Sequence, residues 1–197
     1  MTQKRAINPL LLDLPTEIAT ERLILRVPRP GDGATVNVAV HESLAELRRW
    51  MPWAAGDVPI EESESYCRRC AGTFLTREDF QLLIFERSSG TFAGGCGLHR
   101  INWDVPLMEI GYWVRTSMCG RGYATESTRR LLAYAMETLG AVRVEIRVDD
   151  RNTASQRVAE RAGFELEGVF RNIDRGTDGE LRDMRIYARL TRRLDKR

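Results

Sequence analysis

The segment LMEIGYWVRTSMCGRGYATESTRRLLAYAMETL, residues 107–139, contains a predicted strand, a glycine-rich loop and a predicted helix in succession. In residues 107–114, apolar side chains at every second position predict a strand with one buried face. From residue 124 onward, apolar side chains recur every three to four positions, and Gly140 ends this predicted helix. A loop between a strand and a helix is a common position for a ligand site.

The loop at residues 119–124 suits an anion. Gly120 and Gly122 free the backbone to direct successive N–H groups into one concavity. The helix that follows adds unpaired N-terminal donors and the positive end of its dipole, and Arg115 and Arg121 can add charge. This chemistry favours a phosphate or a pyrophosphate, although such a turn is often only a turn.

Two other phosphate-binding motifs do not fit this loop. A P-loop requires Gly-Lys-Ser/Thr, which the chain lacks. A dinucleotide-binding fingerprint requires a third glycine where Thr125 stands. Neither kind of nucleotide site is therefore expected.

The rest of the chain predicts one mixed α/β domain. Further strands are expected at residues 23–27, 80–86, 91–101, 142–148, 164–170 and 184–190. One or two short helices are expected up to residue 50, and others at residues 61–76 and 152–163. We expect an irregular leader at residues 1–19, the domain at residues 20–191 and a basic tail at residues 192–197.

Composition excludes several classes of protein. The 197 residues are 43% hydrophobic and 29% charged, which is ordinary for a folded soluble protein. A net charge of +2 gives no general attraction for nucleic acid, and no apolar run is long enough for a signal peptide or a membrane span. We expect a cytoplasmic protein without a metal, in which Cys67 and Cys70 lie one helical turn apart.

The segment Gly120-Arg121-Gly122-Tyr123-Ala124 resembles the pyrophosphate loop of the GNAT acyltransferases, whose pattern is Gln/Arg-x-x-Gly-x-Gly/Ala. Gly122 and Ala124 match its last two fixed positions, and Cys119 departs from the first. The resemblance implies that acetyl-coenzyme A is the donor. Its diphosphate would be bound by Cys119, Gly120, Arg121, Gly122, Tyr123 and Ala124.

Other segments resemble the RimJ/RimL-like branch of that family, which acetylates protein N-termini and related amines. They are TERLILR at 20–26, RWMPW at 49–53, EIGYW at 109–113, NTAS at 152–155 and RAGF at 161–164. The likeness implies a mostly antiparallel, twisted sheet of six to seven strands, flanked by helices, with a splayed central strand pair. It also implies that pantetheine pairs with Trp113 and Val114 and contacts Asn152, and it leaves a homodimer open.

Two residues are the catalytic candidates. Glu109 lies among apolar residues of its strand, where burial would raise its pKa and suit it to remove a proton from the amine. It could instead be a structural glutamate paired with an arginine. Ser155 lies in the first turn of a predicted helix and could protonate the departing thiolate, or could only cap that helix together with Asn152.

The sequence leaves more than one acceptor and more than one function open. Trp50, Trp53 and His99 are candidates to line the amine pocket, and His99 could instead assist the base. The acceptor could be the N-terminus of a protein, such as a ribosomal protein, or a small amine such as an antibiotic or an amino acid. A longer acyl donor such as succinyl-coenzyme A, and a non-catalytic sensor of acyl-coenzyme A, are further alternatives.

Overall fold

Residues 107–114 form the strand β5 (Leu107–Val114) near the middle of one mixed sheet. The structure is a computed structural model that describes residues 8–191. Over this range the sheet has eight strands in the order β1-β2-β3-β4-β5-β6-β8-β7. All neighbouring strands are antiparallel except β5 and β6, which are parallel.

The elements follow the predicted order. The other strands are β1 (Glu17–Ala19), β2 (Leu23–Arg26), β3 (Phe80–Glu86), β4 (Phe92–Asn102), β6 (Arg143–Asp149), β7 (Glu165–Arg175) and β8 (Leu181–Leu190). The α-helices are α1 (Gly33–Trp50), α2 (Ile60–Thr76), α3 (Tyr123–Ala133), which continues as a π-helical turn over Tyr134–Thr138, and α4 (Thr153–Arg161). A mixed α/β fold is confirmed.

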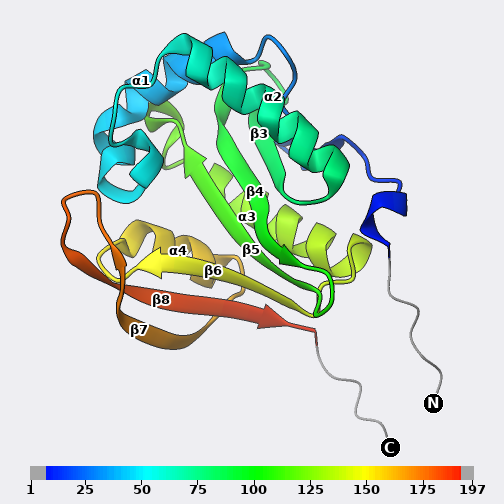
Figure 1. Cartoon of the computed structure of the whole chain (residues 1–197), viewed down its shortest axis with the longest axis vertical. Coiled ribbons are helices and arrows are strands. Elements are labelled where there is room, and N and C mark those ends of the chain that lie inside the picture. The colour runs from blue at the N-terminus through cyan, green and yellow to red at the C-terminus, as the bar shows by residue number, and fades with distance from the viewer. Residues whose placement is uncertain (1–7, 192–197) are drawn as a thin grey trace, which may run out of the picture.

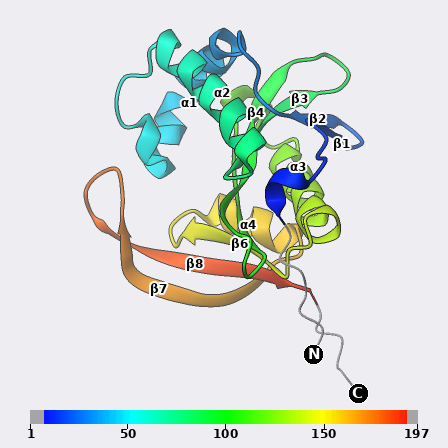
Figure 2. The same cartoon turned by 45° about the vertical axis from the view of Figure 1, so that its right-hand side comes forward.

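Helices cover both faces of the sheet. Figure 1 shows α1 and α2 together on one side and α3 and α4 on the other. The buried apolar face of α1, at Val36, Val40 and Leu47, packs with Leu83 and Phe92 of the sheet. A larger core lies under α3 and α4. The loop end of the β7–β8 hairpin curves up on the left of the view, toward the level of α1 (Figure 2).

The central parallel pair is splayed, as predicted. β5 and β6 pair at only three positions, the last of which joins Glu109 to Glu145. From Gly111 to Val114, β5 keeps its partner β4 but has no pairing with β6. One edge of β5 is therefore free to accept hydrogen bonds from, or donate them to, an extended ligand.

Glycines in β4 let its neighbour approach closely. Gly94 has a φ of +147°, and a Cβ at this position would lie 2.2 Å from the carbonyl oxygen of Trp113. A register shift between Ile84 and Phe85 accompanies it. Small residues along this strand permit both the bulge and the close approach.

Three expectations about the architecture are corrected or extended. The leader contains β1, which pairs with β2, so it is not irregular throughout. The sheet has eight strands where six to seven were expected, because β1 was missed. The segment up to Trp50 is one helix of 18 residues. Residues 1–7 and the basic tail at 192–197 lie outside the described residues, and the domain boundaries stay a prediction.

Cys67 and Cys70 lie one helical turn apart, as expected. Cys67 and Cys70 are buried on α2, and burial raises the pKa of their thiols to about 12 and about 11. Among residues 8–191, no group of three or more potential ligands is arranged to hold a metal ion. In the same range, no helix is both long enough and apolar enough to cross a membrane.

Candidate active site

The loop between β5 and α3 presents a row of free backbone donors. Gly120 and Gly122 have φ values of +76° and +82°, which favour glycine. The N–H groups of residues 120–125 have no hydrogen-bond acceptor within residues 8–191. A Cβ added at Gly120 would meet no atom within 4 Å, so the loop is open on that side. These donors form a concavity suited to an anion.

Side chains of the neighbouring strands fix this loop. Tyr123 donates a hydrogen bond to Glu86 at the end of β3. Arg22 donates to the carbonyl oxygen of Arg121 (3.0 Å) and pairs with Glu126 on α3 at 2.6 Å. Arg121 is half exposed and 3.7 Å from Glu86, so its guanidinium remains accessible to a ligand.

Arg115, the other candidate source of charge, is already paired. Its Nε donates to Glu42 of α1 at 2.6 Å, and this hydrogen bond, with others from Ser117, lowers the pKa of Glu42 to about 2. Cys119 is exposed, and its thiol lies 3.5 Å from the carbonyl oxygen of Arg115. Of the two arginines, Arg121 is the better placed to add charge to the loop.

Asn152 and Ser155 begin α4 beside the open edge of β5. The Asn152 side chain accepts a hydrogen bond from the Ser155 N–H at 3.0 Å, so Asn152 caps α4, as predicted. The Ser155 hydroxyl also lies 2.7 Å from the hydroxyl of Tyr112, whose pKa burial raises to about 12. Sequence reasoning placed Tyr112 on a buried face and missed this contact. The polar hydroxyl of Tyr112 on an otherwise apolar strand face was the signal from which a polar partner could have been predicted.

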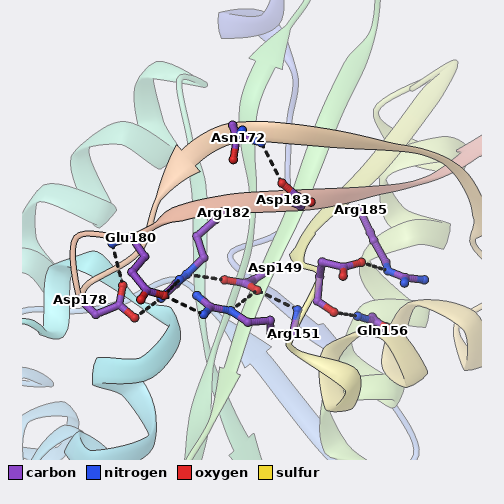
Figure 3. Close-up of polar contacts among 10 residues, drawn as sticks. Asp149, Arg151, Gln156, Asn172, Asp178, Glu180, Arg182, Asp183 and Arg185 are labelled. Carbon is purple, nitrogen blue, oxygen red and sulfur yellow. Dashed lines mark hydrogen bonds and ion pairs between the residues drawn. The ribbon is translucent and has the colours of Figure 1, made fainter.

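A buried arginine connects the β7–β8 hairpin to the end of β6, as Figure 3 shows. The Nε of Arg182 lies 3.1 Å from Asp149, and its terminal nitrogens contact Asp178 and Glu180. Gly176 makes room for it, since a Cβ there would lie 2.4 Å from the guanidinium. The Arg182 side chain is only 7% exposed. Three carboxylates therefore surround one buried cation.

Asp149 and its neighbour Asp150 also make the hydrogen bonds that hold the segment leading into α4 (Figure 3). The main chain of Asp149 accepts from the Asn152 N–H at 2.8 Å, and its side chain accepts from the Arg151 N–H at 2.8 Å. The Asp150 N–H donates to the carbonyl of Asp183 on β8 at 2.9 Å. The hairpin thus holds the turn that places Asn152.

Glu109 lies at the point where β5 and β6 separate. Its carboxylate is 3.2 Å from Arg147 and 3.3 Å from Arg100. Burial raises its pKa, and the two arginines oppose that shift. It pairs in register with His99 on β4 and with Glu145 on β6. The expected raised pKa is confirmed in direction, and so is the alternative of an arginine partner.

A cavity of about 450 Å³ lies between α1, α2 and the sheet. It is lined by Val36, Val40, Met51, Trp53, Asp57, Val58, Glu62, Ser63, Tyr66, Arg69, Gln81, Leu83, Gly95, Cys96, His99, Gly111, Tyr112 and Trp113. Of the predicted acceptor residues, it brings together Trp53 and His99. Trp50 is not among its lining residues and instead stacks against Arg49.

His99 is oriented by an aspartate that sequence reasoning did not find. Its Nδ1 lies 2.8 Å from the carboxylate of Asp79, just before β3. The ring covers Gly97 and Gly111, where an added Cβ would lie 2.6 Å and 3.0 Å from it. Asp79 is 20 positions away in the sequence, so only the strand register reveals the pair.

A sequence model described as "Acetyltransferase (GNAT) domain" matches residues 22–165. The chain belongs to the GNAT acetyltransferase family. It is therefore an acyltransferase, and the resemblance carried by Gly122 and Ala124 is confirmed. The match includes the free donors of the loop, Glu109 and Ser155.

Named relatives agree with this assignment. The GNAT chain is 35% identical over 155 residues to YdaF of Bacillus subtilis (strain 168), provisionally named a ribosomal N-acetyltransferase, with 77% of this chain and 82% of that protein covered. It is 28% identical over 109 residues to an N-acetyltransferase called p20 from Bacillus licheniformis. That second match covers 55% of this chain and spans only 61% of p20.

A solved structure supports the fold and the branch. RimL, an acetyltransferase of ribosomal protein L7/L12, has been solved in complex with coenzyme A. It matches this GNAT chain with a TM-score of 0.81 and 25% identity, over 88% of this chain and 97% of that one. The similarity to the RimL-like branch is thereby confirmed.

Proposed function

We propose that this GNAT chain transfers the acetyl group of acetyl-coenzyme A to a primary amine by direct attack. The observation that carries the proposal is the row of unpaired N–H groups at residues 120–125, which lies next to the open edge of β5. An anion-binding loop and an open strand edge suit the diphosphate and the extended arm of a coenzyme A thioester. The solved RimL complex contains coenzyme A, which supports this choice of donor.

The donor would be held by main-chain groups first. The diphosphate would receive hydrogen bonds from residues 120–125 and charge from Arg121. The pantetheine arm would pair with Trp113 and Val114, where β5 has no partner on its β6 side. Since the side-chain oxygen of Asn152 caps α4, its side-chain amide nitrogen would be the group that donates to the arm.

The reaction requires the nitrogen of the ammonium group to lose two protons and the departing sulfur to gain one. Glu109, with its raised pKa, would take a proton from the ammonium of the acceptor, directly or through a water. The amine nitrogen would then bond to the thioester carbonyl carbon, and a backbone N–H near Val114 would stabilise the oxygen that gains charge. The C–S bond breaks, and the hydrogen-bonded hydroxyls of Ser155 and Tyr112 would donate a proton to the thiolate. The second proton that the nitrogen loses would pass to water, from which the hydroxyl pair is reprotonated.

A release assay for free thiol tests this function. Acetyl-coenzyme A is offered with a panel of N-terminal peptides, polyamines, aminoglycosides and arylalkylamines, and the amide product is identified by mass spectrometry. Amine-dependent thiol release supports the proposal. Donor binding without turnover across the whole panel would favour the non-catalytic sensor, and faster release from succinyl-coenzyme A would favour a longer acyl group. A cytoplasmic location and a homodimer stay predictions.

A further inference from the structure

We propose that the acceptor is a small primary amine that carries an aromatic ring, bound in the cavity between α1, α2 and the sheet. This inference rests on the proposed function and names the substrate class of the same site. The cavity of about 450 Å³ is within the range of about 300–1,000 Å³ that small-molecule sites occupy. Its walls, its floor and the spacing between them each point to this class of acceptor.

The walls are mainly apolar and aromatic. Val36 and Val40 of α1, Val58 and Leu83 are buried there. Such a surface gains by contact with an apolar body and offers little to a polar one. It therefore favours an acceptor with a bulky apolar group.

Two tryptophans provide a place for a planar ring. The rings of Trp53 and Trp113 have centroids 6.3 Å apart and an interplanar angle of 59°. Trp113 is fixed from below, because it packs on Phe92 at 5.8 Å and its indole Nε1 would be 2.7 Å from a Cβ at Gly95. Trp53 is 49% exposed, so much of its surface remains open to another ring. Aromatic rings prefer such tilted or offset contacts.

The floor carries one oriented imidazole. Asp79 holds Nδ1 of His99, so Nε2 is the nitrogen left to face the cavity. Gly111, which the imidazole covers, lies in the part of β5 beyond Glu109 that has no pairing with β6. An amine nitrogen at Nε2 would thus lie beside the strand edge that receives the thioester.

Charged groups near the mouth suit an amine that arrives as a cation. Asp57 and Glu62 line the cavity, and Glu62 pairs with Arg69 at 2.8 Å. Asp57 has no ion pair within the described residues, so its charge is available to attract an ammonium group. Glu109 lies opposite His99 on the neighbouring strand, outside the lining of the cavity, and its carboxylate is paired with Arg100 and Arg147.

The distance between His99 on the floor and Trp113 on the wall sets the length of the acceptor. Gly111 and Trp113 project to the same face of β5 and are two residues apart, which is about 7 Å along a strand. A nitrogen near His99 and a ring near Trp113 are therefore separated by a linker of two or three carbons. An arylethylamine has this spacing. A seryl or alanyl N-terminus has too small a side chain to reach the tryptophans.

The test compares three acceptors with the full-length protein. They are 2-phenylethylamine, ethylamine, which is the same amine without the ring, and a peptide that begins with serine. We expect kcat/KM for 2-phenylethylamine to exceed that for ethylamine at least about tenfold, since aromatic contact and apolar burial add. Trp53→Ala should reduce this ratio to below about threefold, and Trp53→Phe should keep most of it. Val38→Ala, on the exposed outer side of α1, is the matched control and should leave the ratio unchanged.

Either of two results would overturn the inference while leaving acetyl transfer intact. One is a seryl peptide with a higher kcat/KM than 2-phenylethylamine. The other is a ratio near one, or a ratio that Trp53→Ala does not change. If none of the three amines, nor any in the wider panel, releases thiol although the donor binds, the proposed function fails together with this inference. The two failures are thus separate.

Discussion

The hydroxyl of Tyr112 on β5 lies 2.7 Å from the hydroxyl of Ser155 on α4, across the gap where β5 and β6 separate. The two groups come from opposite walls of this gap and form one hydrogen-bonded pair. When one hydroxyl of the pair donates its proton to the leaving thiolate, the other can stabilise the resulting anion with a hydrogen bond. The pair therefore defines the first prediction.

Ser155→Ala and Tyr112→Phe should each lower kcat by about 100-fold, because each removes one member of the proton-donating pair. The KM for acetyl-coenzyme A should change little in either variant. The double variant should be no slower than the slower single one, which a double-mutant cycle measures. Thr153→Ala, on the same helix, is the control. Losses that multiply in the double variant would show that the hydroxyls act independently.

Glu109→Gln should lower kcat by about 100-fold and alter the pH–rate profile. Since burial raises the pKa of Glu109, its carboxylate forms at a higher pH than that of an ordinary glutamate. The rate should rise with pH through that raised pKa in the native protein and lose this rise in the variant. The affinity for acetyl-coenzyme A should stay nearly constant.

Glu145→Gln is the matched control for Glu109, because Glu145 is buried beside it on β6 and contacts the same Arg147. We expect this variant to keep the acidic limb of the profile. Equal losses of kcat in both variants would assign Glu109 to the ion-pair network and not to proton transfer.

Arg182→Met should lower the free energy of unfolding by about 3 kcal/mol, because among the described residues it leaves the partly buried Asp149 with only the half-exposed Arg151, 3.6 Å away, as a cationic partner. Since Asp149 holds the turn before Asn152, the KM for acetyl-coenzyme A should rise as well. Arg182→Lys should restore part of that KM. Arg171→Met, at an exposed position of the same hairpin, should change neither quantity. A loss of stability with an unchanged KM would limit Arg182 to a structural role.

Two glycine substitutions should have opposite effects on stability. Gly94→Ala should destabilise the fold by at least about 3 kcal/mol, because its Cβ would lie 2.2 Å from a β5 carbonyl at a φ that only glycine adopts readily. Gly72→Ala, within α2 and free of neighbours within 4 Å, should stabilise it by about 0.5–1 kcal/mol. Denaturant unfolding measures both. A tolerated Gly94→Ala would contradict the close approach of β4 and β5.

Local patterns predicted most of the strands and helices, because those depend on periodicity within one segment. The alternation of residues 142–148 and the cap at Asn152 are examples, and the structure confirms both. The short strand β1 was missed because three residues after Pro15 carry too little periodicity, and pairing with β2 alone makes them a strand.

Contacts between distant segments could not be predicted in the same way. The Asp79–His99 and Tyr112–Ser155 pairs depend on which strand lies beside which and in what register. Trp50 and Trp53 looked equivalent in the sequence, but α1 continues through Trp50 and directs it away from the cavity that Trp53 lines. The acceptor site could therefore be identified only from the fold, whereas the loop at residues 119–124 could be identified from the sequence.

The central claim is that the main-chain donors of residues 120–125 bind the diphosphate of coenzyme A. Isothermal titration calorimetry with free coenzyme A tests it most directly, on the native protein and on Gly122→Val, whose side chain would strain a φ of +82° at the start of α3. We predict saturable binding to the native protein and at least a 100-fold weaker affinity in a variant that still melts cooperatively. Absence of heat with the native protein, or equal affinity in the variant, would contradict the account.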